Sequence, residues 1–98
     1  MMKNRIETII NQIIEIVTVY DGVEEILLYG SRAKGTFHGK SDIDIAIKGK
    51  DFDIDQLMEK IETIDTLLEI DLVDIENCKN ELLKQEVKKD GITIYRKI

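Results

Sequence analysis

The stretch from Gly30 to Asp44, GSRAKGTFHGKSDID, constrains this chain most, because it joins a small flexible turn to two aspartates one residue apart. Two runs with strand character flank it: EEILLY ends just before the glycine, and DIDIAI begins at the first aspartate. Glycine allows a close backbone approach, and backbone N–H groups in such turns bind phosphate oxygens. We therefore expect turn and acids at one end of a sheet, as a site for a metal-bound phosphate.

The segment 42–48 alternates strictly and predicts a half-buried strand. Ile43, Ile45 and Ile47 share one face, and Asp42 and Asp44 share the other. Two carboxylates at this spacing lie about 6 to 7 Å apart along the strand, close enough to share divalent cations. Alone, this pair could be merely a solvated strand face. The Gly30-Ser31 turn ten residues upstream favours the functional interpretation.

Other periodicities predict helices that pack on a sheet. Apolar residues at three-and-four spacing predict a helix over about 3–20, ended by Asp21-Gly22. RAKG could start a short helix after Gly30-Ser31, and Asp53 or Asp55 could cap another that continues to Ile64. Asn77 could cap a last helix, which Asp90-Gly91 closes and which turns three apolar residues inward: Leu82, Leu83 and Val87.

Three further segments have strand character, namely 23–29, 67–75 and 92–96. The order of elements predicts an α+β fold, with helices packed mainly on one face of a sheet of about four strands. We find no internal repeat and no linker, so residues 1–98 are expected to form a single domain.

A third acid is expected on the strand over 67–75, and the candidates are Asp71 and Asp74. Alternation places Leu68, Ile70 and Leu72 on the core face and Asp71 on the polar face. Asp74 follows the core-facing series to the strand end. Face parity therefore selects Asp71, with Asp74 as the main fallback. Three carboxylates on adjacent strands suit Mg²⁺, and hence phosphoryl or nucleotidyl transfer.

Charge and composition narrow the classes of function. The net charge of −6 argues against coating duplex nucleic acid, where affinity comes from cationic side chains. Residues 41–76 carry twelve acidic and three basic side chains, so the acid gathers around the aspartate motif, whereas residues 77–98 carry three acidic and six basic ones.

No apolar run approaches the roughly 20 residues that span a bilayer, and one cysteine, Cys78, forms no internal disulfide. We expect a cytoplasmic protein without a membrane partner.

These motifs carry a family resemblance. Gly-Ser, about ten residues, Asp-x-Asp and a later strand aspartate resemble the signature of the polymerase-beta-like nucleotidyltransferases. More closely, LLYGSRAKGTFHGKSDIDIAI and EIDLVDI resemble the minimal nucleotidyltransferases, or MNT proteins. The resemblance implies the polymerase-beta-like fold with a mixed sheet, and ATP as substrate. It also implies that Gly30 and Ser31 hold the triphosphate.

The same resemblance assigns two Mg²⁺ to Asp42, Asp44 and Asp71, with Asp71 also helping to deprotonate the acceptor. Arg32 and Lys34 adjoin the turn, and each could meet the triphosphate or be a solvated helix residue. We include Arg32 among the nucleotide-binding residues.

Resemblance to the MNT proteins also implies a partner. They act as antitoxins of HEPN proteins, which are helical ribonuclease toxins, by transferring AMP to a tyrosine of the partner. Larger relatives append a helical domain that holds the nucleobase or the acceptor, whereas this sequence stops one short strand after its last predicted helix, so we expect a partner chain to complete the site.

Two alternative functions stay open. The first is a subunit of an enzyme that acts on a small hydroxylated acceptor such as an aminoglycoside. The second is a binding module that masks its partner and uses the nucleotide only as a structural ligand.

Overall fold

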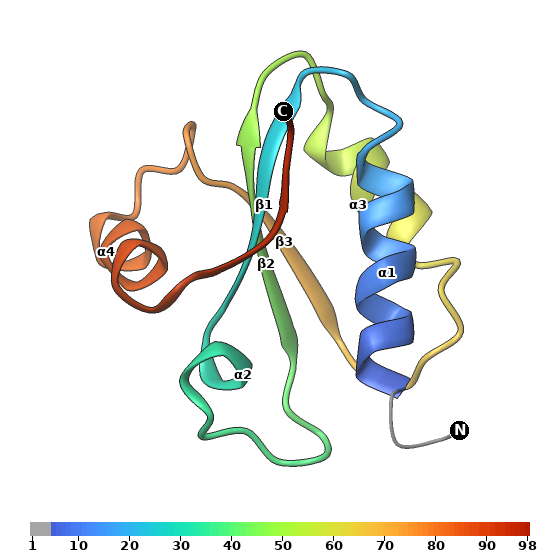
Figure 1. Ribbon diagram of the computed structural model, residues 1–98, viewed down its shortest axis with the longest axis vertical. Coiled ribbons are helices and arrows are strands. Elements are labelled where there is room, and N and C mark those ends of the chain that lie inside the picture. The colour runs from blue at the N-terminus through green and yellow to red at the C-terminus, as the bar shows by residue number, and fades with distance from the viewer. Residues whose placement is uncertain (1–4) are drawn as a thin grey trace.

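Four strands form one mixed sheet in the computed structural model, which describes residues 5–98 (Figure 1). The strands are β1 (Val23–Tyr29), β2 (Ile43–Gly49), β3 (Ile70–Asp74) and β4 (Ile92–Arg96), in the order β3-β2-β1-β4. β1 is antiparallel to both β2 and β4, and β2 is parallel to β3. The four helices are α1 (Arg5–Val17), α2 (Ser31–Lys34), α3 (Ile54–Ile61) and α4 (Glu81–Asp90). The predicted α+β fold is confirmed.

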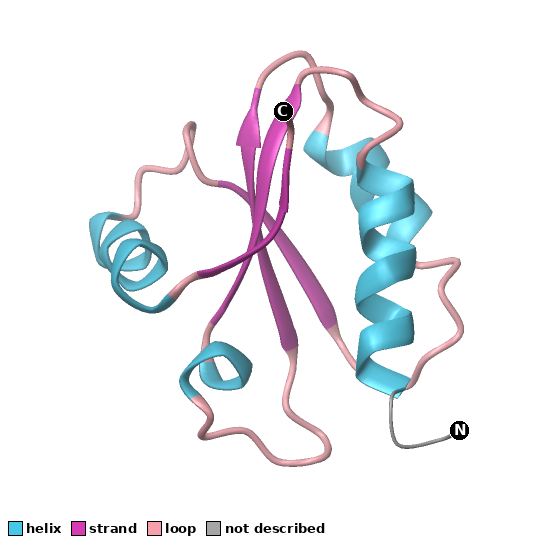
Figure 2. Cartoon of the chain, in the orientation of Figure 1, coloured by secondary structure: helices cyan, strands magenta, loops and turns pink. Residues whose placement is uncertain are grey.

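The main core lies between the sheet and the helices α1 and α3, which cover one of its faces (Figure 2). The alternating isoleucines of β2 point into this core, and Ile43, Ile45 and Ile47 are all fully buried. They meet Ile13 of α1 and Leu57 of α3, which are equally buried. The three-and-four and the two-residue periodicities thus meet in one apolar layer.

α4 packs against the opposite face of the sheet, so the helices do not all cover one side (Figure 1). A smaller cluster forms there from Tyr29 of β1, Ala46 of β2, Ile75 after β3 and Val87 of α4. Asp44 and Asp71 alternate with the core isoleucines of their strands, so the candidate site lies on this second face.

Several predicted boundaries change. Of the helix predicted over 3–20, residues 3 and 4 lie outside the described range, and α1 ends at Val17. β3 begins at Ile70 rather than at residue 67, because Ile70 pairs with Ile43, where β2 begins. Leu67, beyond that partner, is fully exposed. The second strand begins at Ile43, which leaves Asp42 just outside it.

The helix caps and the inward face of α4 also differ in part. Asp53 caps α3, accepting hydrogen bonds from the backbone N–H groups of Asp55 and Gln56. Asn80, not Asn77, caps α4 through the N–H of Leu83, at 3.2 Å. Leu82 was predicted to point inward but is 79% exposed. The inward stripe follows Leu83 and Val87, four residues apart, and Leu82 lies about 100° away from Leu83 around the helix. No helix among residues 5–98 is long and apolar enough to span a membrane.

Candidate active site

Gly30 follows the last residue of β1 and adopts a conformation that few other residues adopt, with φ 75° and ψ −158°. A Cβ atom added here would lie 2.3 Å from Oδ2 of Asp44. The carbonyl of Gly30 accepts hydrogen bonds from the backbone N–H groups of Ala33 and Lys34, both at 3.1 Å, and α2 starts directly after it. The turn therefore needs glycine both for its backbone angles and for its contact with the Asp44 carboxylate.

The sheet brings two of the predicted acids side by side. Asp44 and Asp71 are register partners in the parallel β2–β3 pair, and Tyr29 is the partner of Asp44 on β1. Asp42, just before β2, is exposed. Asp74 is the partner of Ile47 instead, and its Oδ2 accepts a 2.7 Å hydrogen bond from Nδ2 of Asn77. Asp71, which face parity selected, thus lies directly beside Asp44 in the sheet. The chemical role of Asp71 stays a prediction.

Negative charges act on one another in this region. Burial raises the pKa of Asp44, and the charges of Asp71, Asp42 and Glu86 raise it further. Burial together with Asp44, Asp71 and Glu86 raises the pKa of Tyr29 to about 12. Both shifts mean that an added negative charge is disfavoured here, and a cation is favoured.

The donor set fits Mg²⁺, although the described residues include no group of three His, Cys, Asp or Glu side chains placed to hold an ion together. Mg²⁺ takes oxygen ligands and is usually bound by one or two carboxylates plus substrate phosphates, rather than by a complete protein cage. Asp44, with Asp71 beside it and Asp42 just outside the strand, supplies such oxygens. The assignment of metal to these three aspartates stays a prediction.

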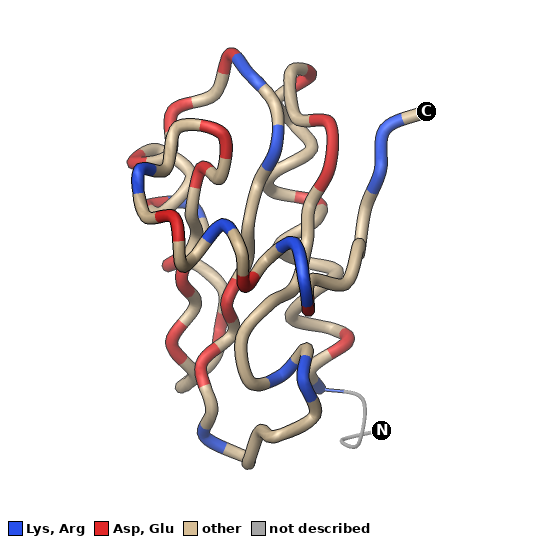
Figure 3. Tube along the Cα trace, turned by 90° about the vertical axis from the view of Figure 1, so that its left-hand side faces the viewer, with Lys and Arg blue, Asp and Glu red and all other residues tan. Residues whose placement is uncertain are grey.

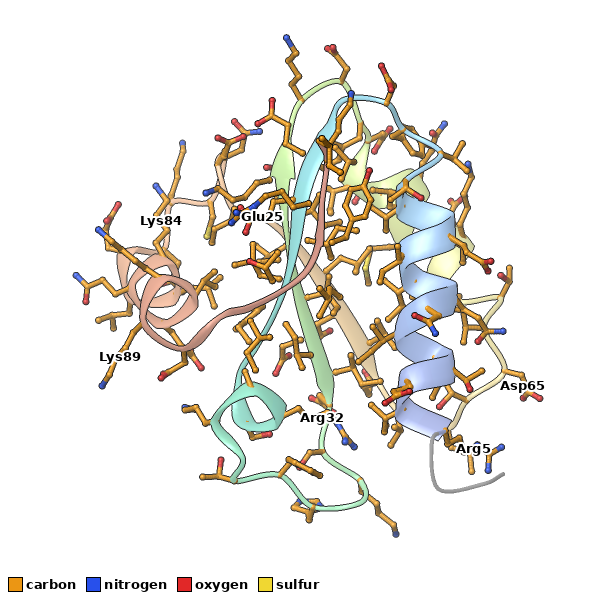
Figure 4. All side chains as sticks on the ribbon, in the orientation of Figure 1. Arg5, Glu25, Arg32, Asp65, Lys84 and Lys89 are labelled. Carbon is orange, nitrogen blue, oxygen red and sulfur yellow. The ribbon has the colours of Figure 1, made fainter. Side chains whose placement is uncertain are left out.

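Hydrogen bonds hold the Arg32 side chain against the loop that follows α2. It is 9% exposed, and its Nε donates to the carbonyl of Ser41 at 3.0 Å, while its Nη2 donates to that of His38 at 3.4 Å. Its guanidinium also lies over the ring of Phe37, 5.1 Å from the centroid. Figure 4 shows Arg32 directed from α2 toward the start of β2, away from α4. This side chain shapes the loop between turn and aspartates.

Lys34 is the second cation of α2 and faces the other way. Its Nζ lies 3.5 Å from a carboxylate oxygen of Glu86 on α4, and both side chains are partly exposed. Such an exposed ion pair is worth about 0 to 1 kcal/mol, so it exchanges readily for another anion. Of the two cations considered for the triphosphate, Lys34 is held less firmly.

The chain was compared with known families, curated proteins and solved structures. A model of the family described as "Polymerase beta, Nucleotidyltransferase" matches residues 11–97. The chain belongs to this family. No curated protein gave a significant match.

Chains in solved toxin–antitoxin complexes have structures similar to that of this nucleotidyltransferase. One, a toxin–antitoxin with AMP-PNP, has 31% sequence identity and a TM-score of 0.72, over 89% of this chain and 73% of that one. Another, the tri-AMPylated Shewanella oneidensis HEPN toxin with its MNT antitoxin, has 26% identity and a TM-score of 0.68, over 93% and 72%. A putative nucleotidyltransferase from Sulfolobus solfataricus, at 20% identity and a TM-score of 0.60 over 98% and 86%, shares the fold. The recognised resemblance to MNT proteins is confirmed.

Sequence reasoning about this nucleotidyltransferase missed Glu86 and Tyr29. Both lie close enough to Asp44 to act on it or to be acted on by it. Tyr29 could have been found, because it precedes Gly30 and shares the strand face of Leu27, opposite Leu28. Glu86 could not, because its position depends on α4 crossing the second face of the sheet.

Proposed function

We propose that this nucleotidyltransferase transfers AMP from ATP to a hydroxyl, that of a tyrosine, on a HEPN-type protein and thereby acts as its antitoxin. The observation that carries the proposal is the register of Asp44 against Asp71, beside a Gly30 backbone that contacts the Asp44 carboxylate. The similarity of this chain to an MNT antitoxin bound to a tri-AMPylated HEPN toxin supports a HEPN protein as the acceptor. Its similarity to a toxin–antitoxin complex with AMP-PNP supports ATP as the donor.

Each site residue has a role in this proposal. Asp42, Asp44 and Asp71 would hold two Mg²⁺, which when bound neutralise phosphate charge and act as Lewis acids. The Gly30-Ser31 backbone and the Ser31 hydroxyl bind the triphosphate, with Lys34 or Arg32 as its cationic neighbour.

The chemistry is one displacement at phosphorus. The acceptor oxygen forms a bond to the α-phosphorus of ATP, and the bond from that phosphorus to the bridging oxygen breaks, so pyrophosphate leaves. The hydroxyl proton passes to Asp71, a carboxylate beside Asp44 at the edge of the sheet.

Labelled ATP tests the transfer. The chain is incubated with ATP labelled in the α-phosphate, Mg²⁺ and a HEPN protein, beginning with any that is encoded beside it. Label should appear on a tyrosine of the HEPN protein, and EDTA, Asp42→Asn or Asp44→Asn should remove it. An unlabelled HEPN protein, or equal labelling by the aspartate variants, would refute the proposal.

The same variants separate the alternatives. If Asp44→Asn still neutralises the toxin as well as the unchanged chain does, masking rather than transfer is the mechanism. If label instead passes to a small hydroxylated compound such as an aminoglycoside, the protein is a small-molecule nucleotidyltransferase.

A further inference from the structure

The second face of the sheet carries opposite charges at its two ends. β2 runs from Asp44 through Ala46 to Lys48 on this face, because alternate residues point the same way. Asp44 and Asp71 lie at the start of the parallel strands, whereas Lys48 lies four residues further on, about 13 Å away. Figure 3 views the molecule from the side of α4, and basic and acidic segments alternate on it. On this face of β2 and β3, the carboxylates of Asp44 and Asp71 thus lie at one end and Lys48 lies toward the other.

These cations surround a groove between α4 and the sheet, with a volume of about 410 Å³. Its floor is apolar and consists of Leu27, Ile75 and Val87. Its rim is basic, with side chains from three elements: Lys48 of β2, Lys84 and Lys88 of α4, and Arg96 of β4. Below, "the basic groove" means this floor and rim.

The positive charge of the basic groove is only partly compensated. Glu25 is the single carboxylate among the described residues that line it, and it contacts both Arg96, at 3.1 Å, and Lys48, at 3.8 Å. Lys84 pairs with Glu81 at 3.7 Å, but the Glu81 side chain is 76% exposed. Within residues 5–98, Lys88 forms no ion pair. Positive charge therefore remains available to a ligand.

We propose that the basic groove binds an acidic segment of the protein that carries the acceptor hydroxyl, with apolar side chains of that segment on the floor. Carboxylates match the rim in charge, and an apolar floor of three side chains matches leucine-like anchors rather than a free phosphate. A nucleic acid fits less well, because its backbone would run from this rim toward the carboxylates of Asp42, Asp44 and Asp71.

Distance links the basic groove to the candidate active site. About four residues of extended chain separate Lys48 from Asp44 on the same face, so one bound segment can place a hydroxyl near Asp44 and its carboxylates near Lys84 and Lys88. The identification of the bound protein as the acceptor rests on the proposed function. The binding of an acidic peptide in the basic groove is independent of the proposed function.

A peptide-binding measurement tests the groove without catalysis. The probe is a fluorescein-labelled peptide of about twelve residues in which glutamates flank two leucines, and its binding is followed by fluorescence anisotropy at low salt. Lys84→Glu and Lys88→Glu should each raise the Kd about fivefold, and the double variant more, since each reversal removes an attraction at the rim. Raising the salt concentration should weaken binding to the unchanged chain.

Lys89→Glu is the matched control, because it makes the same charge change one residue along α4, outside the groove. Figure 4 shows Lys84 and Lys89 on opposite sides of α4. The control variant should bind the peptide within about twofold of the unchanged chain, and melting curves should show that all variants fold. A peptide with lysines in place of the glutamates, and an RNA of similar length, should bind weakly.

Three results would overturn the assignment: no peptide binding to the unchanged chain, equal effects of Lys88→Glu and Lys89→Glu, or tighter binding of the RNA through the same lysines. Asp44→Asn should bind the peptide normally, so loss of AMP transfer in that variant with intact binding separates the groove from the proposed function. If transfer to a HEPN protein occurs, the groove variants should raise KM for that protein and leave KM for ATP unchanged.

Discussion

Single residues at the turn show how tightly backbone and carboxylate are packed. The Asp44 carboxylate occupies the space where any side chain at position 30 would begin, and the Gly30 φ of 75° lies in the region that favours glycine. Asp44 is also among other negative charges, which raise its pKa after burial has done so. The site therefore stores electrostatic repulsion that a bound cation would relieve.

Asp44→Asn should make the free protein more stable while abolishing activity. Because the pKa of Asp44 is raised in the folded protein, a protonated Asp44 stabilises the fold relative to the unfolded chain. This contribution to the free energy of unfolding is lost as pH rises through the folded pKa. At neutral pH a neutral amide removes that cost. Thermal melts without metal should show a higher Tm, and transfer of label should fall by about a hundredfold or more. A lower Tm would show that the Asp44 charge is compensated in the free protein.

Tyr29→Phe should change the response of the fold to alkali. The pKa of Tyr29 is about 12 in the fold against about 10 in an unfolded chain, so its contribution is complete below pH 10 and is lost as pH rises toward 12. The loss is at most roughly 2 to 3 kcal/mol. Urea unfolding at about pH 9 and about pH 11.5 should show a smaller alkaline loss of stability in the variant. Equal losses in both proteins would contradict the assignment.

At the scale of elements, α2 is a four-residue helix whose two cations serve different neighbours. Arg32 holds the loop that leads to Asp42, through the carbonyls of Ser41 and His38. Lys34 reaches α4 through Glu86. α2 thus links the turn to both flanking segments, and the two cations should respond differently to substitution.

Arg32→Ala should mainly reduce stability, by about 1 to 3 kcal/mol, because it removes the donor to the partly buried Ser41 carbonyl and the contact with Phe37. Lys34→Met should leave unfolding nearly unchanged but raise KM for ATP about tenfold, if Lys34 exchanges Glu86 for phosphate. Urea unfolding and steady-state kinetics distinguish the two. Equal KM values for Lys34→Met and the unchanged chain would return the phosphate role to Arg32, as the sequence analysis assigned it.

The whole molecule is a sheet with unequal layers on its two faces. Among residues 5–98, the larger apolar cluster, under α1 and α3, has twelve buried residues, and the smaller, under α4, has four. The larger cluster supplies most of the hydrophobic stabilisation, and the smaller one leaves room on its face for the polar site and for the basic groove. Stability and chemistry are therefore separated on the two faces.

Truncation of leucine and isoleucine should follow burial rather than sequence pattern. Ile45→Ala removes a fully buried side chain from the larger cluster and should cost about 2 to 5 kcal/mol. Leu82→Ala, at a position 79% exposed, should cost less than about 0.5 kcal/mol. The free energy of unfolding in urea is the measurement. A large loss from Leu82→Ala would mean that α4 is rotated relative to this structure.

The sequence by itself determined the elements, the fold class and the set of candidate acids. Alternation in 42–48 and 67–75 is a local property of a strand, and it placed Asp44 and Asp71 on one face before any contact was known. Gly30-Ser31 and the aspartates also sufficed to recognise the family, which the match over residues 11–97 confirms.

Only the tertiary structure decided which surfaces those elements present to one another. Periodicity gives each helix an apolar stripe but not the sheet face that it covers, so α4 was not expected on the second face. Likewise, the sequence favoured Arg32 over Lys34 for the triphosphate, whereas in the structure Arg32 contacts loop carbonyls and Lys34 contacts Glu86. Contacts between residues far apart in the chain depend on packing, which local patterns do not encode.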